Sequence, residues 1–342
     1  MTSMPPKTVT PETDYLSSPD GYRIQKTLKK PVSFSGIGLH SGEQAKVKVL
    51  PAEPNHGLVF TRKDLKKSPR IFAHYDAVVS TLLATTLGLK ESEEARVGTV
   101  EHILAALFGM GITNALIEVT GTEIPILDGS AVPFLDAFLD AGIDIQPFST
   151  PTLKVLKPIK VYEHGAVCEL LPRERLRLTT SVDFPHPAIG LQTFALELTP
   201  GAFRDEVCKA RTFGFIRDLE KLKVRKLAQG ASLENVLGFS DDAILNPEGM
   251  RFPDECVRHK LLDALGDLAL CGMWIQGEMV SYRGGHSIHF ALLKALKEQK
   301  THWEILPAQS LGQSLGQKLG QSEGQKLPNS ASIPVHTTFA VK

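Results

Sequence analysis

Residues 99–119 have the sequence TVEHILAALFGMGITNALIEV, which predicts a helix followed directly by a strand. The apolar run at residues 100–108 is typical of a helix, for which Thr99 would be the N-cap and Gly109 the closing residue. Residues 114–120 are strand-like. This stretch therefore predicts one helix-to-strand unit, and the segments around it indicate what that unit belongs to.

The flanking segments predict two similar sets of strands and helices. Before the unit, residues 45–49 alternate as a strand does, and after it residues 133–140 are amphipathic and helical. The sequence QPFSTP at residues 146–151 interrupts this periodicity and predicts a linker. A second set follows, with strands near residues 153–162, 168–171 and 177–184 and helices at residues 255–271 and 288–299. The pattern favours an α+β fold with two similar halves.

Composition and charge limit the possible partners. The chain has 342 residues, which is longer than a domain with a single hydrophobic core usually is. Its 42% hydrophobic residues suit a folded protein. Lys plus Arg total 38 and Asp plus Glu total 38, so no global positive field exists to hold nucleic acid. An anionic ligand must therefore be bound by a few local cations.

The cysteines and the apolar segments indicate the compartment. Four cysteines lie far apart without a CxxC pair, which argues against a disulfide framework or a Cys-rich zinc module and fits a reducing environment. The N-terminus lacks the basic start and apolar stretch of a signal peptide. The sequence also contains no run of about 18 apolar residues, the length needed to cross a bilayer. We expect a cytoplasmic protein without a transmembrane segment, and a monomer.

Both ends of the chain are polar and poor in hydrophobic residues. Residues 1–21 and 305–342 are therefore expected to be disordered extensions. The C-terminal extension repeats SLGQ, SLGQ, KLGQ and SEGQ over residues 310–325, a unit too short for a solenoid. A flexible tail is favoured over a partner-binding one.

One predicted helix carries polar residues at helical spacing. In VRHKLLDALGDL (residues 257–268), His259, Asp263 and Asp267 recur every four residues and share one helix face. A histidine and a carboxylate one turn apart can hold a metal ion, and the next acid can orient a neighbouring group. The alternative is an ordinary solvated face of an amphipathic helix.

A second candidate is the pair Glu101 and His102, at the start of the helix predicted after Thr99. Successive helical residues diverge by about 100°, so His102 could bind a metal while Glu101 reaches a water activated there. The alternative is that Glu101 complements the helix dipole and His102 lies on the surface. Together, His102, His259 and Asp263 form a coherent ligand set for a catalytic zinc ion with an open position.

Two further segments could carry chemistry. In RGGHS (residues 283–287), two glycines would let a loop tip present His286, a residue suited to proton transfer near neutral pH. The alternative is a turn with an incidental histidine. The segment KARTFGF (residues 209–215) mixes cations, a hydroxyl and aromatic rings, which suits a phosphate and a base or sugar, although such segments are usually surface loops.

Six blocks in this order resemble the UDP-3-O-acyl-N-acetylglucosamine deacetylase family, known as LpxC. They are SGIGLHSGE (35–43), TVEHILAALFGMGITNALIEV (99–119), EIPILDGSA (123–131), ARTFGF (210–215), VRHKLLDALGDL (257–268) and GGHS (284–287). The resemblance implies zinc-dependent removal of acetate from UDP-3-O-acyl-N-acetylglucosamine, the committed step of lipid A synthesis in Gram-negative bacteria.

The resemblance also implies a fold. It consists of two similar β-α-α-β domains, packed helix face to helix face with the active site between them. In this chain they would span residues 22–146 and 147–304, with an insert near residues 209–240 that forms a passage for the acyl chain.

Roles for individual residues follow from the matching positions. The family's zinc ligands match His102, His259 and Asp263, and Fe²⁺ could replace the zinc in the cell. The resemblance further implies the catalytic residues, namely Glu101 as general base, His286 as general acid, Asp267 as the group that holds His286 charged, and Thr212 near the oxyanion. These roles predict a bell-shaped pH profile with Glu101 setting the acidic limb and His286 the alkaline limb.

Substrate contacts follow from the same comparison. Three residues match family positions near the UDP group, namely Lys260 at the diphosphate, Phe215 and Arg283. Apolar contacts with the substrate are expected along the insert, from Phe213, Ile216, Leu219 and Leu222.

One position departs from the family pattern and leaves a role open. Many members have Leu-Asn where this chain has Ile288 and His289, and the sequence does not assign a role to His289. Two other functions compete with the deacetylase, namely a binding protein that has lost catalysis and a zinc amidohydrolase for another N-acetylated sugar. The first is disfavoured, because none of the five expected metal and acid–base residues is missing.

Overall fold

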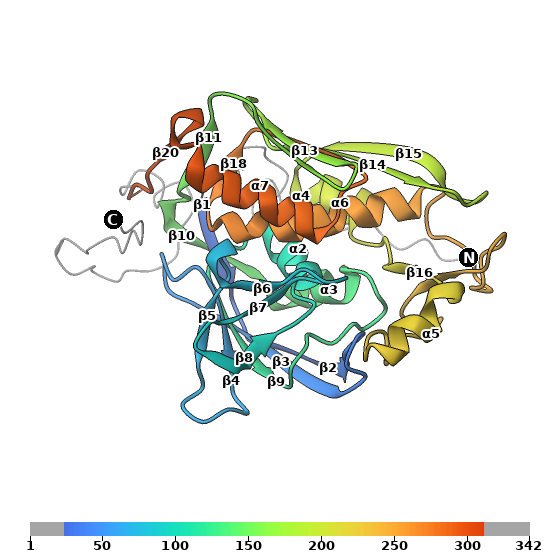
Figure 1. Ribbon diagram of the computed structural model, residues 1–342. Coiled ribbons are helices and arrows are strands. Elements are labelled where there is room, and N and C mark those ends of the chain that lie inside the picture. The colour runs from blue at the N-terminus through green and yellow to red at the C-terminus, as the bar shows by residue number, and fades with distance from the viewer. Residues whose placement is uncertain (1–23, 311–342) are drawn as a thin grey trace, which may run out of the picture. The chain divides into compact units, whose positions relative to one another are not determined.

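The computed structural model describes residues 24–310 and contains two five-stranded sheets (Figure 1). The first has the strand order β2-β3-β9-β4-β5 and the second the order β12-β13-β19-β14-β15. The strands of the first sheet are β2 (Val32–Ile37), β3 (Gln44–Pro51), β9 (Ala115–Thr120), β4 (Leu58–Arg62) and β5 (Arg70–Phe72). Those of the second are β12 (Ile159–Glu163), β13 (Ala166–Leu171), β19 (Glu278–Tyr282), β14 (Arg177–Phe184) and β15 (Gly190–Glu197).

The two sheets repeat each other in direction as well as in order. In both, a single parallel pair, β4 with β9 or β14 with β19, is flanked by antiparallel neighbours. Each sheet therefore forms in the same way, with the strand that follows the first long helix inserted between two earlier hairpins.

The helices occupy equivalent places in the two halves. Between β5 and β9 the chain forms α2 (Glu101–Gly109), and between β15 and β19 it forms α6 (Glu255–Leu268). After β9 follows α3 (Val132–Ala141), and after β19 follows α7 (His286–Glu298). The α+β class and the two similar halves predicted from the sequence are thus confirmed, whereas the domain boundary between residues 146 and 147 stays a prediction.

The helices lie between the sheets. Every residue of α2 is buried, and α2 packs against α6, which in turn packs on β14 and β15 (Figure 1). In the second sheet, α7 packs on β12 and β13. In the first half, α3 contacts β2. Phe34 of β2 contacts Phe134 of α3 with ring centroids 4.9 Å apart. Because α2 and α6 lie against each other at the centre, polar groups on their facing sides are removed from solvent.

Shorter elements close the halves and decorate them. Strand β1 (Ile24–Leu28) pairs with β10 (Ile143–Ser149), and β11 (Thr152–Val155) pairs with β20 (Trp303–Leu306) and β18 (Trp274–Gln276). The first half also contains the small sheet β6 (Val78–Ser80), β7 (Thr86–Leu89) and β8 (Ser92–Val97). The second contains α4 (Pro200–Ala202), β16 (Phe213–Phe215), α5 (Ile216–Val224) and β17 (Leu237–Phe239). Single helical turns lie at Tyr75–Ala77, Phe203–Val207, Ala269–Cys271 and Lys300–His302.

Two local predictions are wrong. Thr99 is not a helix cap, because α2 begins at Glu101 and the Thr99 hydroxyl instead donates to Glu123 Oε1 at 2.6 Å. The predicted linker at residues 146–151 is mostly strand β10, in which Gln146 is buried and accepts from Asn114 at 2.7 Å. Proline and serine there suggested a break, but tertiary hydrogen bonds stabilise a strand.

The predicted ends differ partly from the structure. Strand β20 includes residues 305 and 306, and Gln309 donates to the Ser149 hydroxyl at 2.7 Å, so the folded part continues past the predicted start of the tail at residue 305. The predictions for residues 1–21 and for the repeat after residue 310 lie outside the described residues. Within residues 24–310, no helix has the length and apolar character needed to span a membrane.

Candidate active site

The site is built where α2 and α6 approach most closely. Gly266 of α6 makes this approach possible, since a Cβ at that position would lie 2.1 Å from the backbone oxygen of Glu101. Gly266 lies between Asp263 and Asp267 in the sequence. The polar residues of α6 are therefore held directly against the first turn of α2, which carries Glu101 and His102.

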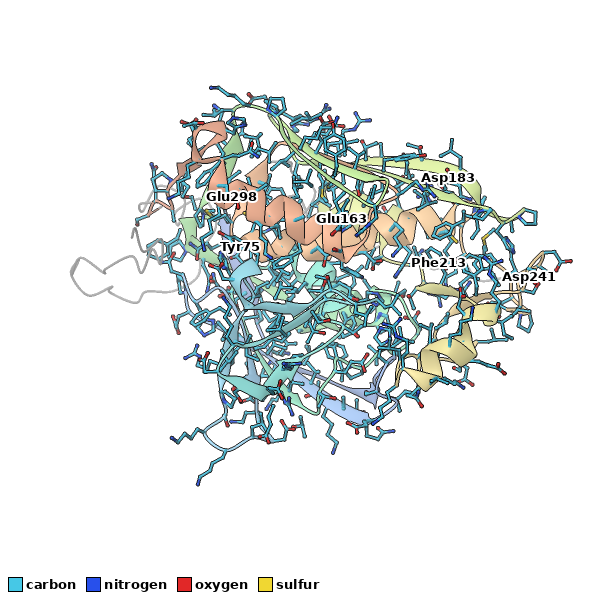
Figure 2. All side chains as sticks on the ribbon, in the orientation of Figure 1. Tyr75, Glu163, Asp183, Phe213, Asp241 and Glu298 are labelled. Carbon is cyan, nitrogen blue, oxygen red and sulfur yellow. The ribbon has the colours of Figure 1, made fainter. Side chains whose placement is uncertain are left out.

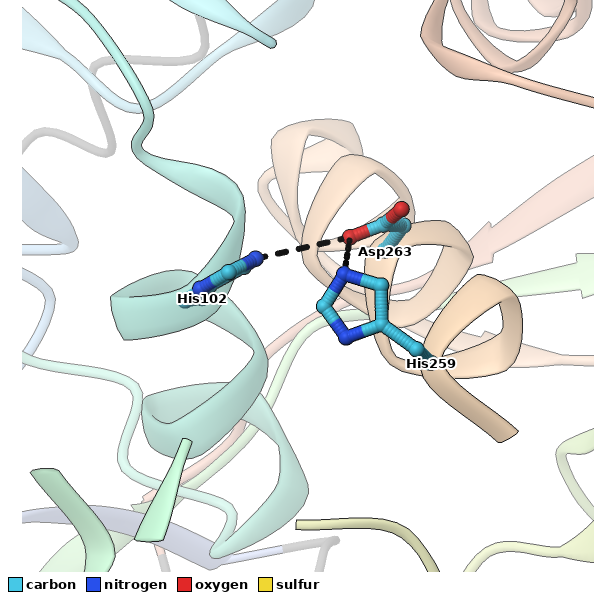
Figure 3. Close-up of side chains that lie close together, drawn as sticks. All are labelled: His102, His259 and Asp263. Atoms are coloured by element: carbon cyan, nitrogen blue, oxygen red, sulfur yellow. Dashed lines mark ion pairs between the residues drawn. The ribbon is translucent and has the colours of Figure 1, made fainter. Parts of the chain in front are cut away.

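Three buried side chains from these helices converge (Figure 3). His102 Nε2 lies 3.6 Å and His259 Nε2 3.2 Å from Asp263 Oδ1. The possible donor atoms of the three residues all lie within 4.8 Å of one another, and each residue is at most 3% exposed. The alternatives of a solvated helix face and of a surface histidine are thus wrong for these residues.

The groups around the cluster leave its donor atoms facing each other. The Nδ1 atom of His259 lies 3.0 Å from the backbone oxygen of Ala210, which fixes Nδ1 as the donor and leaves the Nε2 lone pair toward Asp263. The Oδ1 atom of Asp263 is buried and has no hydrogen-bond partner among residues 24–310. A buried carboxylate oxygen without a donor is costly.

A cation would resolve that cost. Two imidazole nitrogens and one carboxylate oxygen are the donor set of catalytic zinc sites with an open fourth position, and of some iron sites. The residues present therefore fit a divalent metal ion, and a His, His and Asp group that could bind a metal is present. The pKa of Asp263 agrees with a charged carboxylate as ligand. Burial alone would raise this pKa, yet His259 and Lys260 hold it well below its usual range.

Lys260 extends the cluster toward its edge. Its ammonium donates to Asp263 Oδ2 at 2.8 Å and lies 5.7 Å from the centre of the Phe213 ring. Phe213 is labelled in Figure 2. Burial alone would lower the pKa of Lys260, but the Asp263 carboxylate outweighs it and raises the pKa. The lysine thus remains charged beside the site, and its side chain is about a quarter exposed.

Glu101 and His286 face each other next to the cluster. Glu101 Oε2 accepts from the backbone N–H of Thr85 at 3.0 Å, while its Oε1 lies 3.7 Å from His286 Nε2. Burial raises the pKa of the Glu101 carboxyl, although His286 and His102 partly oppose it. His286 is the first residue of α7 and only 7% exposed, so the predicted exposed loop tip is wrong.

Asp267 fixes His286 from behind. Its Oδ2 lies 2.8 Å from His286 Nδ1 and 2.9 Å from His289 Nδ1, and its Oδ1 accepts from the Thr85 hydroxyl at 2.6 Å. Burial alone would lower the pKa of His286, but the carboxylates of Asp267 and Glu101 raise it to about 9. His286 is therefore an imidazolium at neutral pH, with Nε2 as the free donor.

The remaining predicted residues lie on the loop after η3 (Phe203–Val207), on β16 and α5, and before α7. The ring of Phe213 lies 6.3 Å from that of His259, and Phe215 lies 4.9 Å beneath the Arg217 guanidinium. Thr212 donates its backbone N–H to Gly129 at 2.8 Å. Arg283 is exposed, and its guanidinium has no hydrogen-bond partner among residues 24–310.

The insert helix α5 presents apolar side chains to solvent. None of its residues is fully buried, and Ile216 is 55% exposed. Leu219 and Leu222 are partly buried. Exposed aliphatic side chains on a short helix could contact an acyl chain.

Sequence reasoning missed two residues of the site. Thr85 contacts both Glu101 and Asp267, yet it lies in a Thr-rich segment without a motif. Glu123 accepts from the backbone N–H groups of His40 and Ser41, at 2.9 and 2.8 Å, as well as from the Thr99 hydroxyl. Its position in EIPILDGSA gave a signal, but only the fold shows that it holds the segment preceding Glu101.

Comparison with known proteins agrees with this geometry. A family model described as LpxC, UDP-3-O-acyl N-acetylglycosamine deacetylase, matches residues 25–298. The chain belongs to the LpxC family. Within this family, a relative from Myxococcus xanthus is 44% identical over 291 residues, which cover 85% of this chain and 91% of that protein.

Two further relatives are similarly close. A protein from Histophilus somni is 42% identical and matches 82% of this chain and 92% of its own length. One from Brucella melitensis biotype 2 is 42% identical and matches 83% and 99%. All three are named UDP-3-O-acyl-N-acetylglucosamine deacetylase. The resemblance to the LpxC family seen in the sequence is thus confirmed.

Proposed function

We propose that this LpxC-family chain hydrolyses the N-acetyl group of UDP-3-O-acyl-N-acetylglucosamine and releases acetate and the free amine. The named activity of its relatives and their coverage of the chain support this reaction. The observation that carries the proposal is the pairing of Glu101 with His286, 3.7 Å apart and directly beside the His102, His259 and Asp263 cluster. A carboxylate that could act as base and a cation that could act as acid, beside a group that could bind a metal, support this reaction.

The three clustered residues would hold one zinc ion, with Fe²⁺ as an alternative in the cell. When bound, such an ion supplies Lewis acidity that polarises the acetyl carbonyl and makes a water molecule easier to deprotonate. Asp263 Oδ1 is the atom whose lack of a partner supports this assignment most directly.

Glu101 and His286 would divide the proton transfers. Glu101 takes a proton from the attacking water, and its carboxylate is held for this by the Thr85 N–H. The His286 imidazolium stabilises the negative charge that develops on the acetyl oxygen and then protonates the leaving nitrogen. Asp267 keeps His286 charged and directed by its bond to Nδ1. Thr212 is a further candidate for contact with the oxyanion.

The substrate would lie along the adjoining edge. Lys260 is a partly exposed cation beside the cluster and suits the diphosphate, while Phe215 and Arg283 are candidates for the rest of the UDP group. Phe213 is a candidate for apolar contact with the substrate. The acyl chain would meet the apolar side chains of α5, namely Ile216, Leu219 and Leu222. Each methylene removed from water contributes about 0.8 kcal/mol.

A cytoplasmic location and a monomeric state belong to the same proposal. All four cysteines are free and buried, which fits a reducing compartment. Light scattering on the purified protein would measure the oligomeric state.

The test is acetate release from substrates that differ in one part. We expect turnover of the UDP-linked, acylated substrate, and a loss of about 100-fold or more in kcat for Glu101→Ala and His286→Ala. Chelation should abolish the activity and added zinc restore it. An exposed control, Glu220→Ala on α5, should retain wild-type kcat.

The same assay addresses the competing functions. Equal turnover of an N-acetylated sugar without UDP would favour the other amidohydrolase, and tight binding without turnover would favour a binding protein. Full activity after complete removal of the metal would contradict the metal-dependent reaction.

A further inference from the structure

His289 lies one helical turn after His286 on α7 and contacts the same carboxylate. The Nδ1 atoms of both histidines lie within 2.9 Å of Asp267 Oδ2, so this single oxygen is shared between them. His289 is 2% exposed, so its ring is almost entirely enclosed by protein. A buried imidazole must be satisfied on both nitrogens by protein groups.

The second nitrogen of His289 faces a hydroxyl, and this contact permits a neutral imidazole. Its Nε2 lies 3.1 Å from the hydroxyl of Ser281 on β19, which is also buried. A hydroxyl can donate to Nε2, whereas the Asp267 carboxylate can only accept from Nδ1. The neutral imidazole with its proton on Nδ1 satisfies both contacts with one proton, and no second charge is placed beside the His286 imidazolium.

The backbone before α7 passes close to this pair. A Cβ on Gly284 would lie 2.0 Å from Ser281 Oγ and 3.0 Å from His289 Nε2. Gly284 therefore lets the loop before α7 pass directly over the serine and histidine. The loop that ends at His286 and the hydrogen bond that orients His289 are thus packed together.

We infer that His289 is a positioning residue, which in its neutral Nδ1–H form holds the Asp267 carboxylate in the orientation that directs and charges His286. This inference rests on the proposed function, because it assigns His289 a part in the same proton transfer. The Nδ1–H dipole also takes up part of the negative charge of Asp267, so that this carboxylate raises the basicity of His286 less than it would alone.

Other titratable groups around His286 set the background for this effect. They are Glu101 on α2, Asp263 and Asp267 on α6, and His40 between β2 and β3. Cys168 on β13 lies near Asp267, but burial raises the pKa of its thiol to about 12, so it adds no charge at neutral pH. Of these groups, Asp267 is the one whose side chain lies within hydrogen-bond distance of His289, so a substitution at position 289 acts on His286 through that carboxylate.

Two isosteric substitutions separate the two contacts of His289. In His289→Asn, the amide nitrogen is bonded to Cγ as Nδ1 is, so it can donate to Asp267 but cannot reach Ser281. In His289→Gln, the amide lies one bond farther and can reach Ser281 but not Asp267. Both variants are neutral and polar, so they serve as matched controls for each other.

The kinetic experiment compares pH profiles of the zinc-loaded variants. We expect His289→Asn to keep kcat within about threefold of the wild type and to leave the alkaline limb of kcat/KM in place, whereas His289→Gln should lower kcat roughly tenfold with KM unchanged. The alkaline limb of His289→Gln should move to higher pH by about one unit, because the Asp267 carboxylate then interacts with His286 alone. Equal losses in both variants, or an unmoved limb in His289→Gln, would overturn the inference.

A second measurement does not depend on activity. Nitrogen-15 NMR of the histidine side chains in the zinc-loaded protein distinguishes the two neutral tautomers from the imidazolium, and the signals missing in His289→Asn assign His289. We expect the Nδ1–H tautomer across neutral pH, and Ser281→Ala should increase the other form. An imidazolium or an Nε2–H tautomer in the wild type would refute the inference. If the wild type releases no acetate, the proposed function fails while the NMR result still decides the state of His289.

Discussion

The Glu101 carboxylate lies 3.7 Å from the His286 imidazole, measured between Oε1 and Nε2. This separation is too long for a direct hydrogen bond, so the two groups are not neutralised by each other and remain available to a third. Each is held from behind, Glu101 by the Thr85 backbone and His286 by Asp267. The acid and the base are thus held by different groups, which are joined through Thr85, whose hydroxyl donates to Asp267. Substitutions of side chains that hold only one of them should have separable effects.

Substitution of Asp267 should move the alkaline limb of the pH profile. The carboxylate is the strongest influence that keeps the pKa of His286 near 9 against burial, so Asp267→Asn should bring this pKa down toward 6.5 or below. His286 acts as the protonated acid, and a lower pKa therefore means that activity is lost at lower pH. The measurement is kcat/KM against pH, with the exposed Asp205→Asn as the control. A limb that stays in place in Asp267→Asn would refute this account.

Glu123→Gln should destabilise the segment before α2. The Glu123 side chain accepts from the backbone of His40 and Ser41 and from the hydroxyls of Ser41 and Thr99. An amide would turn a donor toward these donors, at a cost of about 1–3 kcal/mol in the free energy of unfolding. Urea denaturation measures it, and Glu118→Gln on the partly exposed side of β9 is the matched control. Equal stability of the two variants would contradict the assigned role.

Gly266→Ala should separate α2 from α6. Its Cβ would lie 2.1 Å from the Glu101 backbone oxygen, a contact that only a shift of the helices can relieve. We expect a loss of stability of about 3 kcal/mol or more and weaker metal binding, because the ligands come from both helices. Gly201→Ala, where the nearest atom would be 4.0 Å away, should be close to wild type. Thermal unfolding and zinc content after dialysis provide the two readouts.

Removal of the Asp263 carboxylate should abolish the response to zinc. Zinc added at about 100 times its dissociation constant should stabilise the metal-free wild type by about 2.7 kcal/mol, because zinc binds the folded state. Asp263→Asn should show little of this effect, whereas substitution of the exposed Asp140 on α3, Asp140→Asn, should retain it. Thermal unfolding with and without zinc measures the difference. An undiminished response in Asp263→Asn would exclude Asp263 as a ligand.

A charge on the apolar side of α5 should affect only substrates with long acyl chains. Ile216→Asp should raise KM about tenfold for a long-chain substrate and leave a short-chain one unchanged, because each buried methylene contributes about 0.8 kcal/mol. Val224 is 86% exposed and lies at the other end of α5, so Val224→Asp is the control. Equal effects of Ile216→Asp on both substrates would argue against an acyl-chain contact.

The sequence by itself determined the elements that carry the site. Apolar periodicity located α2 and α6, and the spacing of His259, Asp263 and Asp267 placed them on one helix face. The local sequence pattern was sufficient there, because residues i and i+4 of a helix always lie on the same side of it. The six blocks also indicated the LpxC family before any contact was known.

Only the tertiary structure decided what those residues do together. Spacing along one helix cannot reveal that α2 lies against α6, nor that Gly266 allows this, because the contact joins residues far apart in the sequence. The same holds for Thr85, which contacts Asp267 across 182 positions, and for Thr99, whose hydroxyl binds Glu123 instead of capping a helix. Burial by distant elements changes a polar helix face into a site, because it removes the water that would otherwise satisfy each group.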